Sequence, residues 1–324
     1  MRTIPQNLPS SLKPASVASV FLLSLAMSAA APLARAQRAP GELLSGPAGI
    51  GNLSSVAANG DTLTLRAGRD SLTVQVVEPN ILRVHYHPNG ATSASTPVLD
   101  PHRTWPNNTP ATIKTGADPI TISTNAMTVA ITKSPVRLTV EDRSGQALLS
   151  EPTTGGVYPG GLQFRSAVEG PFFGIDATAI PGENMDARQD IRMGVVREGG
   201  KVLAGQQGDG GAPLIYTMRY GLLVDSDGGD FKVIPDAGAL HFTGGSRKDV
   251  EYFIIVGDPV ATMHAVADIT GHAPMMPKWT LGFLNSQWGT TESEVTNIID
   301  EYRAKQIPID GFILDFDWKA WGED

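Results

Sequence analysis

The chain has 324 residues, of which 25 are Lys or Arg and 33 are Asp or Glu, so its net charge at pH 7 is −8. Hydrophobic residues make up 41% of it, which is enough to build a core and excludes a wholly disordered chain. The absence of Cys excludes disulfide scaffolds, Cys-based metal sites and thiol catalysis, and the acidic balance argues against nucleic-acid binding. The length predicts roughly two domains.

The first 36 residues have the pattern of a secretory signal peptide. Two positive residues, Arg2 and Lys13, precede an uncharged stretch whose most apolar part is Val17–Ala31, and residues 34–36 form an A-x-A cleavage signal. The alternative is a membrane anchor, but the apolar part is shorter than the ~20 residues that a span needs. We therefore expect cleavage after Ala36, a secreted or periplasmic location, and no membrane association of the remaining chain.

Between about residue 60 and residue 256 the pattern is mostly β and predicts an antiparallel sandwich. Short runs of alternating, β-branched residues are separated by turn residues at the spacing that a sandwich requires. The predicted strands are Thr62–Arg66, Ser71–Val77, Ile81–Tyr86, Met127–Ile131, Val136–Val140, Ala147–Leu149, Tyr220–Val224 and Phe231–Ile234. We expect the last two to form a hairpin. The stretch from Pro159 to Gly211 is mostly Gly and polar residues, which predicts a long functional loop.

Three patterns in this region point only weakly to ligands. The acidic residues of the 225–230 turn resemble part of a calcium loop but lack its downstream Glu, which favours a solvated hairpin turn. His85 and His87 share a strand face without a third metal ligand nearby, which favours surface histidines. The Gly-rich run at 205–211 lacks the Lys-Ser/Thr of a phosphate loop. We therefore expect no metal and no cofactor.

After residue 257 the pattern changes to helices and strands in alternation. Asp258 and Pro259 are typical of a helix start, and this linker helix is predicted to run to about Thr270. Thr280–Leu284 predicts a short buried strand, a capping box at 291–294 begins an amphipathic helix, and Gly311–Leu314 predicts a second buried strand. Strand, helix and strand form a βαβ unit, which indicates a parallel sheet covered by helices.

Asp315 and Asp317 directly follow the second of these strands. Residues i and i+2 of a strand share a face, and the C-terminal ends of parallel strands are where α/β barrels bind their ligands. Trp318 and Trp321 come next. This combination suits a sugar, because its hydroxyls can donate to the carboxylates while its C–H faces pack on the rings. The alternative is that one Asp caps the following loop.

Several spaced blocks, taken together, resemble glycoside hydrolase family 31, which contains α-glucosidases and α-xylosidases. The dense blocks are Tyr252–Pro259, Ile269–Gly271, Met276–Phe283 and Ile307–Trp318, and looser ones are Ile81–Tyr86, Val136–Leu149 and Gly208–Asp225. The resemblance implies a galactose-mutarotase-like β-sandwich followed by the first βαβ unit of a truncated (β/α)₈ barrel. The expected division is a signal peptide over 1–36, the sandwich over 37–257, a linker helix over 258–275 and the start of the barrel over 276–324.

The resemblance also implies an activity, retaining hydrolysis of α-linked glucosides or xylosides by two Asp residues. Both come from later barrel strands in the family, and no Trp-x-Asp nucleophile segment follows Asp315 here. We therefore assign no catalytic residue to this chain and expect it to be inactive alone. The unclosed barrel strands also predict poor solubility.

The resemblance carries over to substrate binding. Asp315 corresponds to the family Asp that binds hydroxyls of the sugar in the −1 subsite, and Phe316 stands near that sugar. Asp209 is the candidate for an Asp that a sandwich loop sends into the pocket, and Trp288 follows the first barrel strand. Asp317 and Trp318 complete the expected substrate-binding set. The commoner α-glucosidases have Ile-Asp-Tyr after the first Asp, whereas this chain has Phe-Asp-Trp, which leaves the substrate sugar open.

Two other functions remain open at this point. One is a non-catalytic carbohydrate-binding sandwich protein. The other is a sugar epimerase on a similar β scaffold, which needs a His and Glu pair in the sandwich, and the sequence shows no convincing pair. The expected partner is an oligosaccharide or other glycoside, and the sequence leaves the oligomeric state undetermined.

Overall fold

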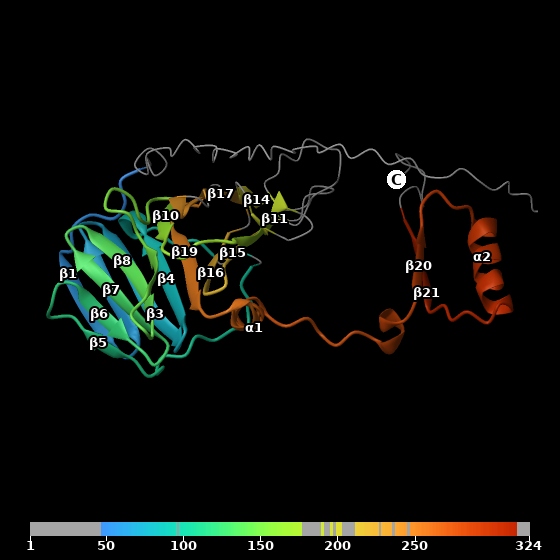
Figure 1. Cartoon of the computed structure of the whole chain (residues 1–324), viewed down its shortest axis with the longest axis horizontal. Coiled ribbons are helices and arrows are strands. Elements are labelled where there is room, and N and C mark those ends of the chain that lie inside the picture. Colours follow the sequence, from blue (N-terminus) through green and yellow to red (C-terminus); the bar gives the residue numbers. More distant parts are fainter. Residues whose placement is uncertain are drawn as a thin grey trace, which may run out of the picture. The chain divides into compact units, whose positions relative to one another are not determined.

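The structure is a computed structural model that describes residues 47–94, 96, 98–176, 189–190, 195–196, 199–202, 211–226, 228–234, 237–244 and 247–315. Within them the chain forms a two-sheet β-sandwich, a helix packed on one sheet, and a βαβ unit (Figure 1). The mostly β, antiparallel fold predicted from the sequence is confirmed. No helix among the described residues is long and apolar enough to cross a membrane.

The sandwich consists of two antiparallel sheets, which we call sheet A and sheet B. Sheet A has ten strands in the described residues, in the order β1 (Ser55–Asn59), β2 (Thr62–Ala67), β3 (Asp70–Glu78), β4 (Ile81–His87), β19 (Val250–Val256), β16 (Tyr220–Val224), β15 (Gly211–Tyr216), β11 (Phe173–Asp176), β13 (Val195–Val196) and β12 (Gln189–Asp190). Sheet B has nine, in the order β14 (Gly199–Val202), β17 (Gly229–Ile234), β18 (Ala239–Thr243), β10 (Gly161–Ser166), β9 (Ala147–Ser150), β8 (Val136–Asp142), β7 (Met127–Lys133), β6 (Ile120–Ser123) and β5 (Thr112–Lys114).

The core lies between the two sheets and follows from the period-2 pattern of the strands. In β7, for example, Met127, Val129 and Ile131 are buried, whereas Thr128 between them is not. Phe164 of β10 and Tyr252 of β19 meet edge to face, with ring centroids 5.7 Å apart, and so join the two sheets. The strands predicted from alternation are confirmed, with ends that differ by at most two residues.

The predicted hairpin between β16 and β17 is wrong. β16 pairs with β15 and β19 in sheet A, whereas β17 pairs with β14 and β18 in sheet B. The chain therefore crosses from one sheet to the other after Asp225, which is buried rather than solvated. Its carboxylate accepts a hydrogen bond from the hydroxyl of Thr96 (2.5 Å) and pairs with Arg247 (3.0 Å), and these contacts anchor the crossing.

The prediction of one long loop from Pro159 to Gly211 is also wrong, because β10 to β14 lie within it. Glycine there reflects close packing as well as turns. A side chain at Gly161 in β10 would lie 2.3 Å from the hydroxyl oxygen of Tyr158 and 2.6 Å from the carbonyl oxygen of Phe242. The Gly content of this stretch is therefore compatible with strands.

The helix predicted to start after Asp258 is confirmed as α1 (Pro259–Thr270). The Asp258 side chain caps it by accepting a hydrogen bond from the backbone N–H of Ala261 (2.8 Å). Thr262 and Ile269 are buried against sheet A, on the face turned away from the sandwich core. A β-carbon at Gly221 of β16 would lie 2.4 Å from the methyl group of Thr262, so the missing side chain lets α1 lie directly on the strand.

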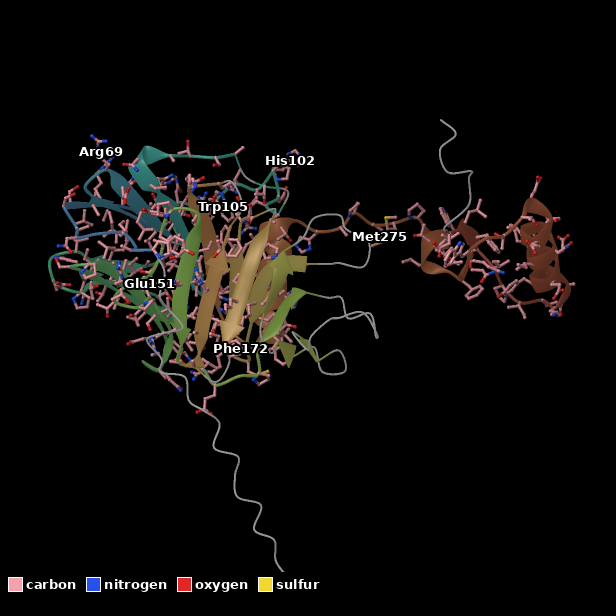
Figure 2. The ribbon with its side chains drawn as sticks, turned by 90° about the horizontal axis from the view of Figure 1, so that it is seen from above. Arg69, His102, Trp105, Glu151, Phe172 and Met275 are labelled. Carbon is pink, nitrogen blue, oxygen red and sulfur yellow. The ribbon has the colours of Figure 1, made fainter. Side chains whose placement is uncertain are left out.

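Two buried residues of opposite charge, Arg137 and Glu151, hold the turn that follows β9. Figure 2 labels Glu151. The carboxylate of Glu151 accepts hydrogen bonds from the backbone N–H groups of Leu138 (2.8 Å) and Val157 (3.1 Å). Arg137 donates to the carbonyl oxygens of Ile50, Val136, Pro152 and Thr153. Burial raises the pKa of Glu151 to about 7, although the two N–H groups and the charge of Arg137 oppose the rise.

The βαβ unit consists of β20 (Leu284–Gln287), α2 (Glu292–Ala304) and β21 (Gly311–Leu314), and its two strands are parallel as predicted. The capping box is confirmed, because the Thr291 side chain accepts from the N–H of Glu294 and the Glu294 side chain accepts from the N–H of Thr291. The first predicted strand is misplaced. Residues Lys278–Leu281 form a 3₁₀ turn, and the strand begins only at Leu284.

The prediction that both barrel strands are buried is wrong for the residues that the structure describes. All four residues of each strand are partly or fully exposed, and none of the described residues 292–304 of α2 is buried. Trp279, Leu281 and Phe283, on the segment before β20, are also exposed. Apolar runs in this unit therefore lack the neighbours that bury similar runs in the sandwich.

Candidate functional site

The first candidate site is the C-terminal edge of the β20–β21 pair. The last paired residues of the two strands are Gln287 and Leu314. Trp288 directly follows the first strand, and Asp315 directly follows the second. The backbone N–H of Asp315 continues the ladder by donating to the carbonyl oxygen of Gln287 (3.3 Å). The structure thus brings two of the six predicted substrate-binding residues to the same strand ends.

Asp310, which the sequence analysis did not single out, fixes the opposite end of this pair. Its backbone N–H donates to the carbonyl oxygen of Phe283 (2.9 Å), and its carboxylate accepts from the N–H of Phe283 (3.0 Å). A side chain at Gly282 would lie 2.1 Å from that carboxylate. Through these two hydrogen bonds, Asp310 sets the register that places Asp315 at the strand end. The sequence signal that could have identified Asp310 is an acidic residue directly before an apolar strand.

The chemistry available at this edge is the recognition of hydroxyl groups. Asp315 is exposed and Trp288 is 62% exposed, so both are accessible to a ligand. An ionised carboxylate accepts hydrogen bonds from hydroxyls, and an indole ring offers an apolar face to C–H groups. The other predicted site residues, Asp209, Phe316, Asp317 and Trp318, lie outside the described residues, so their place at this site stays a prediction.

A second polar cluster lies on the outer face of sheet A, where the sequence predicted only surface histidines. His85 of β4 is largely buried, with its side chain 16% exposed. Its Nε2 lies 3.0 Å from Asp249, and its Nδ1 lies 3.5 Å from Glu251 of β19. The sandwich therefore does bring a His and a Glu side by side. The pair was missed because its members are far apart in sequence and meet only when β4 pairs with β19.

The electrostatics of this cluster fix the charges of its members. Burial lowers the pKa of His85, although Glu251 and Asp249 oppose this. Asp249 is itself buried, but hydrogen bonds from Ser93 and His85 and the charge of Arg247 hold its pKa well below its usual range. Because an ionised carboxylate only accepts, His85 donates from Nε2 to Asp249.

The His85 and Glu251 pair is not placed for acid–base chemistry on a sugar. The Glu251 side chain is only 3% exposed, and its carboxylate accepts a 2.6 Å hydrogen bond from Arg83. A general base must reach the proton that it removes, and this carboxylate lies behind Arg83 and His85. The carboxylates instead position those two side chains. No group of three or more His, Cys, Asp or Glu residues in the described part of the chain is arranged to hold a metal.

Comparison with known proteins gives matches to two family models. Residues 71–184 match the glycosyl hydrolase 31 N-terminal galactose mutarotase-like domain, and residues 273–324 match the glycosyl hydrolases family 31 TIM-barrel domain. The described residues of the first match, 71–176, lie in the sandwich, and the second match includes the βαβ unit with the strand-end site. Together the two models account for more than half of the chain.

Individual relatives agree with the family models. A 1,6-alpha-glucosyltransferase from Sporosarcina globispora is 43% identical over 291 residues, which are 85% of this chain and 22% of that protein. An alpha-xylosidase from Saccharolobus solfataricus is 31% identical over 119 residues, which are 36% of this chain and 16% of that protein. This chain therefore spans about a fifth of the length of these curated relatives.

The solved structures agree on the fold. A GH31 dextranase from Flavobacterium johnsoniae, in complex with isomaltotriose, superposes with a TM-score of 0.67 at 21% identity over 83% of this chain and 34% of that one. A GH31 alpha-xylosidase from a soil metagenome, in complex with xylose, gives a TM-score of 0.65 at 19% identity, over 83% of this chain and 42% of that one. From the two family models, the glucosyltransferase and this shared fold, the chain belongs to glycoside hydrolase family 31, of which it carries the N-terminal portion.

Proposed function

We propose that this chain is the N-terminal portion of a secreted, retaining α-glycosidase that acts on α-linked glucosides or xylosides. The observation that carries the proposal is the position of Asp315 at the C-terminal end of a parallel strand, beside Trp288 and within the matched barrel segment. In (β/α)₈ barrels that end of the strands holds the active site. The relatives named as a glucosyltransferase and a xylosidase support a glycoside as the substrate.

In this proposal Asp315 is a substrate-binding residue. Its carboxylate accepts hydrogen bonds from hydroxyls of the sugar whose bond is broken, and so orients that ring for attack. Such bonds strengthen as the ring distorts toward the oxocarbenium-like transition state. The proposal assigns the nucleophile and the acid/base to later barrel strands of the family, and it bases secretion on the signal-peptide pattern of residues 1–36.

The test measures hydrolysis of p-nitrophenyl α-glucoside and α-xyloside by the protein with its complete barrel and by its Asp315→Asn variant. A charge-assisted hydrogen bond contributes about 1.5–3 kcal/mol, so we expect losing one or two of them to lower kcat/KM roughly 100-fold. The matched control is Asp300→Asn, on the exposed surface of α2, which should leave kcat/KM unchanged.

Two outcomes would contradict the proposal. If the protein with a complete barrel hydrolyses neither glycoside but binds saccharides, the chain belongs to a carbohydrate-binding protein instead. If Asp315→Asn and Asp300→Asn have the same kcat/KM, the strand end does not contact the reacting sugar.

A further inference from the structure

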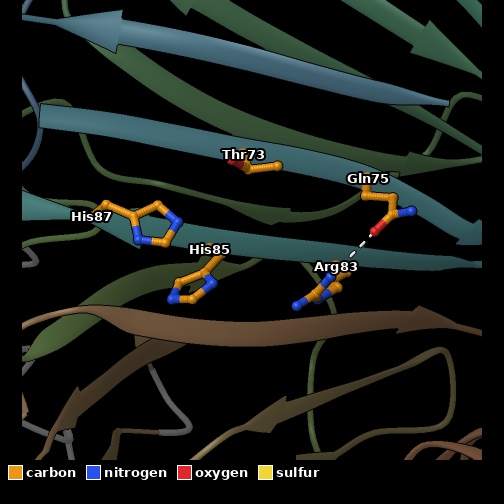
Figure 3. Close-up of a pocket in the computed structure, with 5 residues that line it drawn as sticks. All are labelled: Thr73, Gln75, Arg83, His85 and His87. Carbon is orange, nitrogen blue, oxygen red and sulfur yellow. Dashed lines mark hydrogen bonds between the residues drawn. The ribbon is translucent and has the colours of Figure 1, made fainter. Parts of the chain in front are cut away.

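The outer face of sheet A is divided into a covered half and an open half. Over β16 and β19, α1 and the segment around Leu99 and Trp105 cover an apolar surface that includes Phe253 and Ile255. Over β3 and β4 the outward side chains are polar, and they line a depression of about 230 Å³. We call it the sheet-A pocket, and it is lined by Thr73, Gln75, Arg83, His85 and His87 (Figure 3).

The side chains of the sheet-A pocket are held from behind by other polar groups. Arg83 donates from Nε to Glu251 (2.6 Å) and from an amino group to the amide oxygen of Gln75 (3.3 Å), the bond drawn in Figure 3. The amide nitrogen of Gln75 donates in turn to the carbonyl oxygen of Pro106 (2.6 Å). His85 is fixed by Asp249. Side chains fixed in this way lose little further conformational entropy when a ligand binds.

The charge balance of the pocket disfavours an anion. Two guanidinium groups, Arg83 and Arg247, face three carboxylates within the same network, those of Asp225, Asp249 and Glu251. Burial lowers the pKa of His85, which disfavours a positive charge on its imidazole. A phosphate or carboxylate ligand would therefore meet no excess of positive charge, whereas an uncharged polar ligand incurs no electrostatic penalty.

The groups that remain available in the pocket both donate and accept. The hydroxyl of Thr73 has no hydrogen-bond partner among the described residues. His87 Nδ1 donates to the carbonyl oxygen of Ala91 (3.1 Å), and its Nε2 makes no hydrogen bond to the residues that the structure describes. The guanidinium of Arg83 supplies further N–H donors, and its Cζ lies over the ring of Trp105, 4.6 Å from the ring centre. This mixture matches the hydroxyl groups of a sugar.

We propose that the sheet-A pocket is a saccharide-binding subsite of the sandwich domain, with room for about one sugar residue of an uncharged glucan. Its volume lies below the ~300 Å³ at which pockets for drug-sized ligands begin, which suits one residue rather than a buried oligosaccharide. The inference rests on the proposed function only in the choice of glucose-based sugars as probes. The pocket itself is formed by side chains of β3 and β4 and does not include the strand end at Asp315.

The experiment is isothermal titration of the full chain with maltotriose, isomaltotriose and inorganic phosphate. We expect weak binding of at least one trisaccharide and no binding of phosphate. Thr73→Arg fills the pocket from an outward position of β3 and is expected to weaken trisaccharide binding at least ~10-fold. The matched control is Thr128→Arg, which makes the same change at an outward position of β7 in sheet B and should bind like the unaltered chain.

Four results would overturn the inference. The first is that neither trisaccharide binds at any sugar concentration up to its solubility limit. The second is that Thr73→Arg binds as tightly as Thr128→Arg. The third is that phosphate binds in place of the sugars. The fourth is self-association of the chain that Thr73→Arg abolishes, because a second copy would then occupy the pocket.

One further variant separates this inference from the proposed function. Asp315→Asn shows which site a measured signal comes from, because Asp315 belongs to the strand end and Thr73 belongs to the sheet-A pocket. If Asp315→Asn abolishes trisaccharide binding and Thr73→Arg does not, the sugar binds at the strand end. That result refutes the sheet-A pocket as the binding site and supports the proposed function. Failure of the hydrolysis test would leave this titration and its outcome intact.

Discussion

Two similar apolar runs in this chain have opposite environments. Phe253-Ile254-Ile255 in β19 is fully buried, whereas in Phe312-Ile313-Leu314 of β21 the last two side chains are 48% and 51% exposed. β19 lies between β4 and β16, with the second sheet on one face and α1 on the other, whereas the partner described for β21 is β20. The difference shows that an apolar run identifies a strand but its neighbours decide whether it is buried.

The two helices differ in the same way. α1 buries Thr262, Ala265 and Ile269 against sheet A, whereas none of the described residues of α2 is buried. The apolar face of α2 is only half-buried, and Tyr302 packs near Phe283, with ring centroids 5.6 Å apart. The helix is further supported by its capping box and an i,i+4 ion pair of Lys305 with Glu301 (2.9 Å). We infer that the sandwich is stabilised by its own core, while the βαβ unit is only locally ordered in the chain by itself.

The largest expected effect that separates the two regions comes from Arg137→Ala. It leaves the buried carboxylate of Glu151 without its cation and removes hydrogen bonds to four carbonyl oxygens. Leaving a buried charge uncompensated in this way costs about 3–5 kcal/mol, and urea titration of the sandwich measures the loss. The control is Arg143→Ala in an exposed turn, which should change the free energy of unfolding by less than ~0.5 kcal/mol. Equal effects of the two variants would contradict the role assigned to the pair.

Ile269→Ala tests the covered half of sheet A. Ile269 is fully buried in α1, and an Ile→Ala change at such a site costs about 2–5 kcal/mol. We expect a lower urea midpoint and faster amide exchange in α1. Val260→Ala, on the 66% exposed side chain of the same helix, should have almost no effect. If Ile269→Ala were equally silent, α1 would not be docked on the sheet.

Thr291→Ala has the smallest expected effect and is confined to the βαβ unit. It removes the N-cap of α2, which typically costs about 1 kcal/mol of helix stability. Amide exchange in α2 should become faster while the urea midpoint of the sandwich stays the same. Thr296→Ala, in the middle of the helix, should not accelerate exchange, because Ala has the higher helix propensity. A change in the sandwich midpoint would show that the two regions are coupled.

The sequence predicted what depends on local pattern. Alternation located β2, β3, β4, β7, β8, β9, β16 and β17, although it missed β5 and β6, and the capping signals located α1 and α2. It did not predict what depends on distant neighbours. The crossing after Asp225 needs Thr96 and Arg247, and the burial of His85 needs the pairing of β4 with β19. The exposure of β21 likewise depends on packing partners and not on its own residues.

The candidate sites follow the same rule. The position of Asp315 at a strand end was predictable, because it follows a short apolar run directly. The sheet-A pocket was not, because Gln75, Arg83 and His85 acquire their meaning only from Pro106, Glu251 and Asp249, which lie on other segments. From the sequence alone, a polar residue at an outward strand position is predicted to be exposed to solvent. That prediction is the same whether or not the fold places carboxylates next to the residue.

Native-state hydrogen exchange of the full chain, read by mass spectrometry, tests most directly whether the sandwich is self-sufficient and the βαβ unit is not. We expect the amides of β4, β16 and β19 to exchange only through global unfolding, and those of α2 and β21 to exchange orders of magnitude faster. Protection of α2 and β21 equal to that of β19 would contradict the account, because it would mean that the two regions unfold as one cooperative unit.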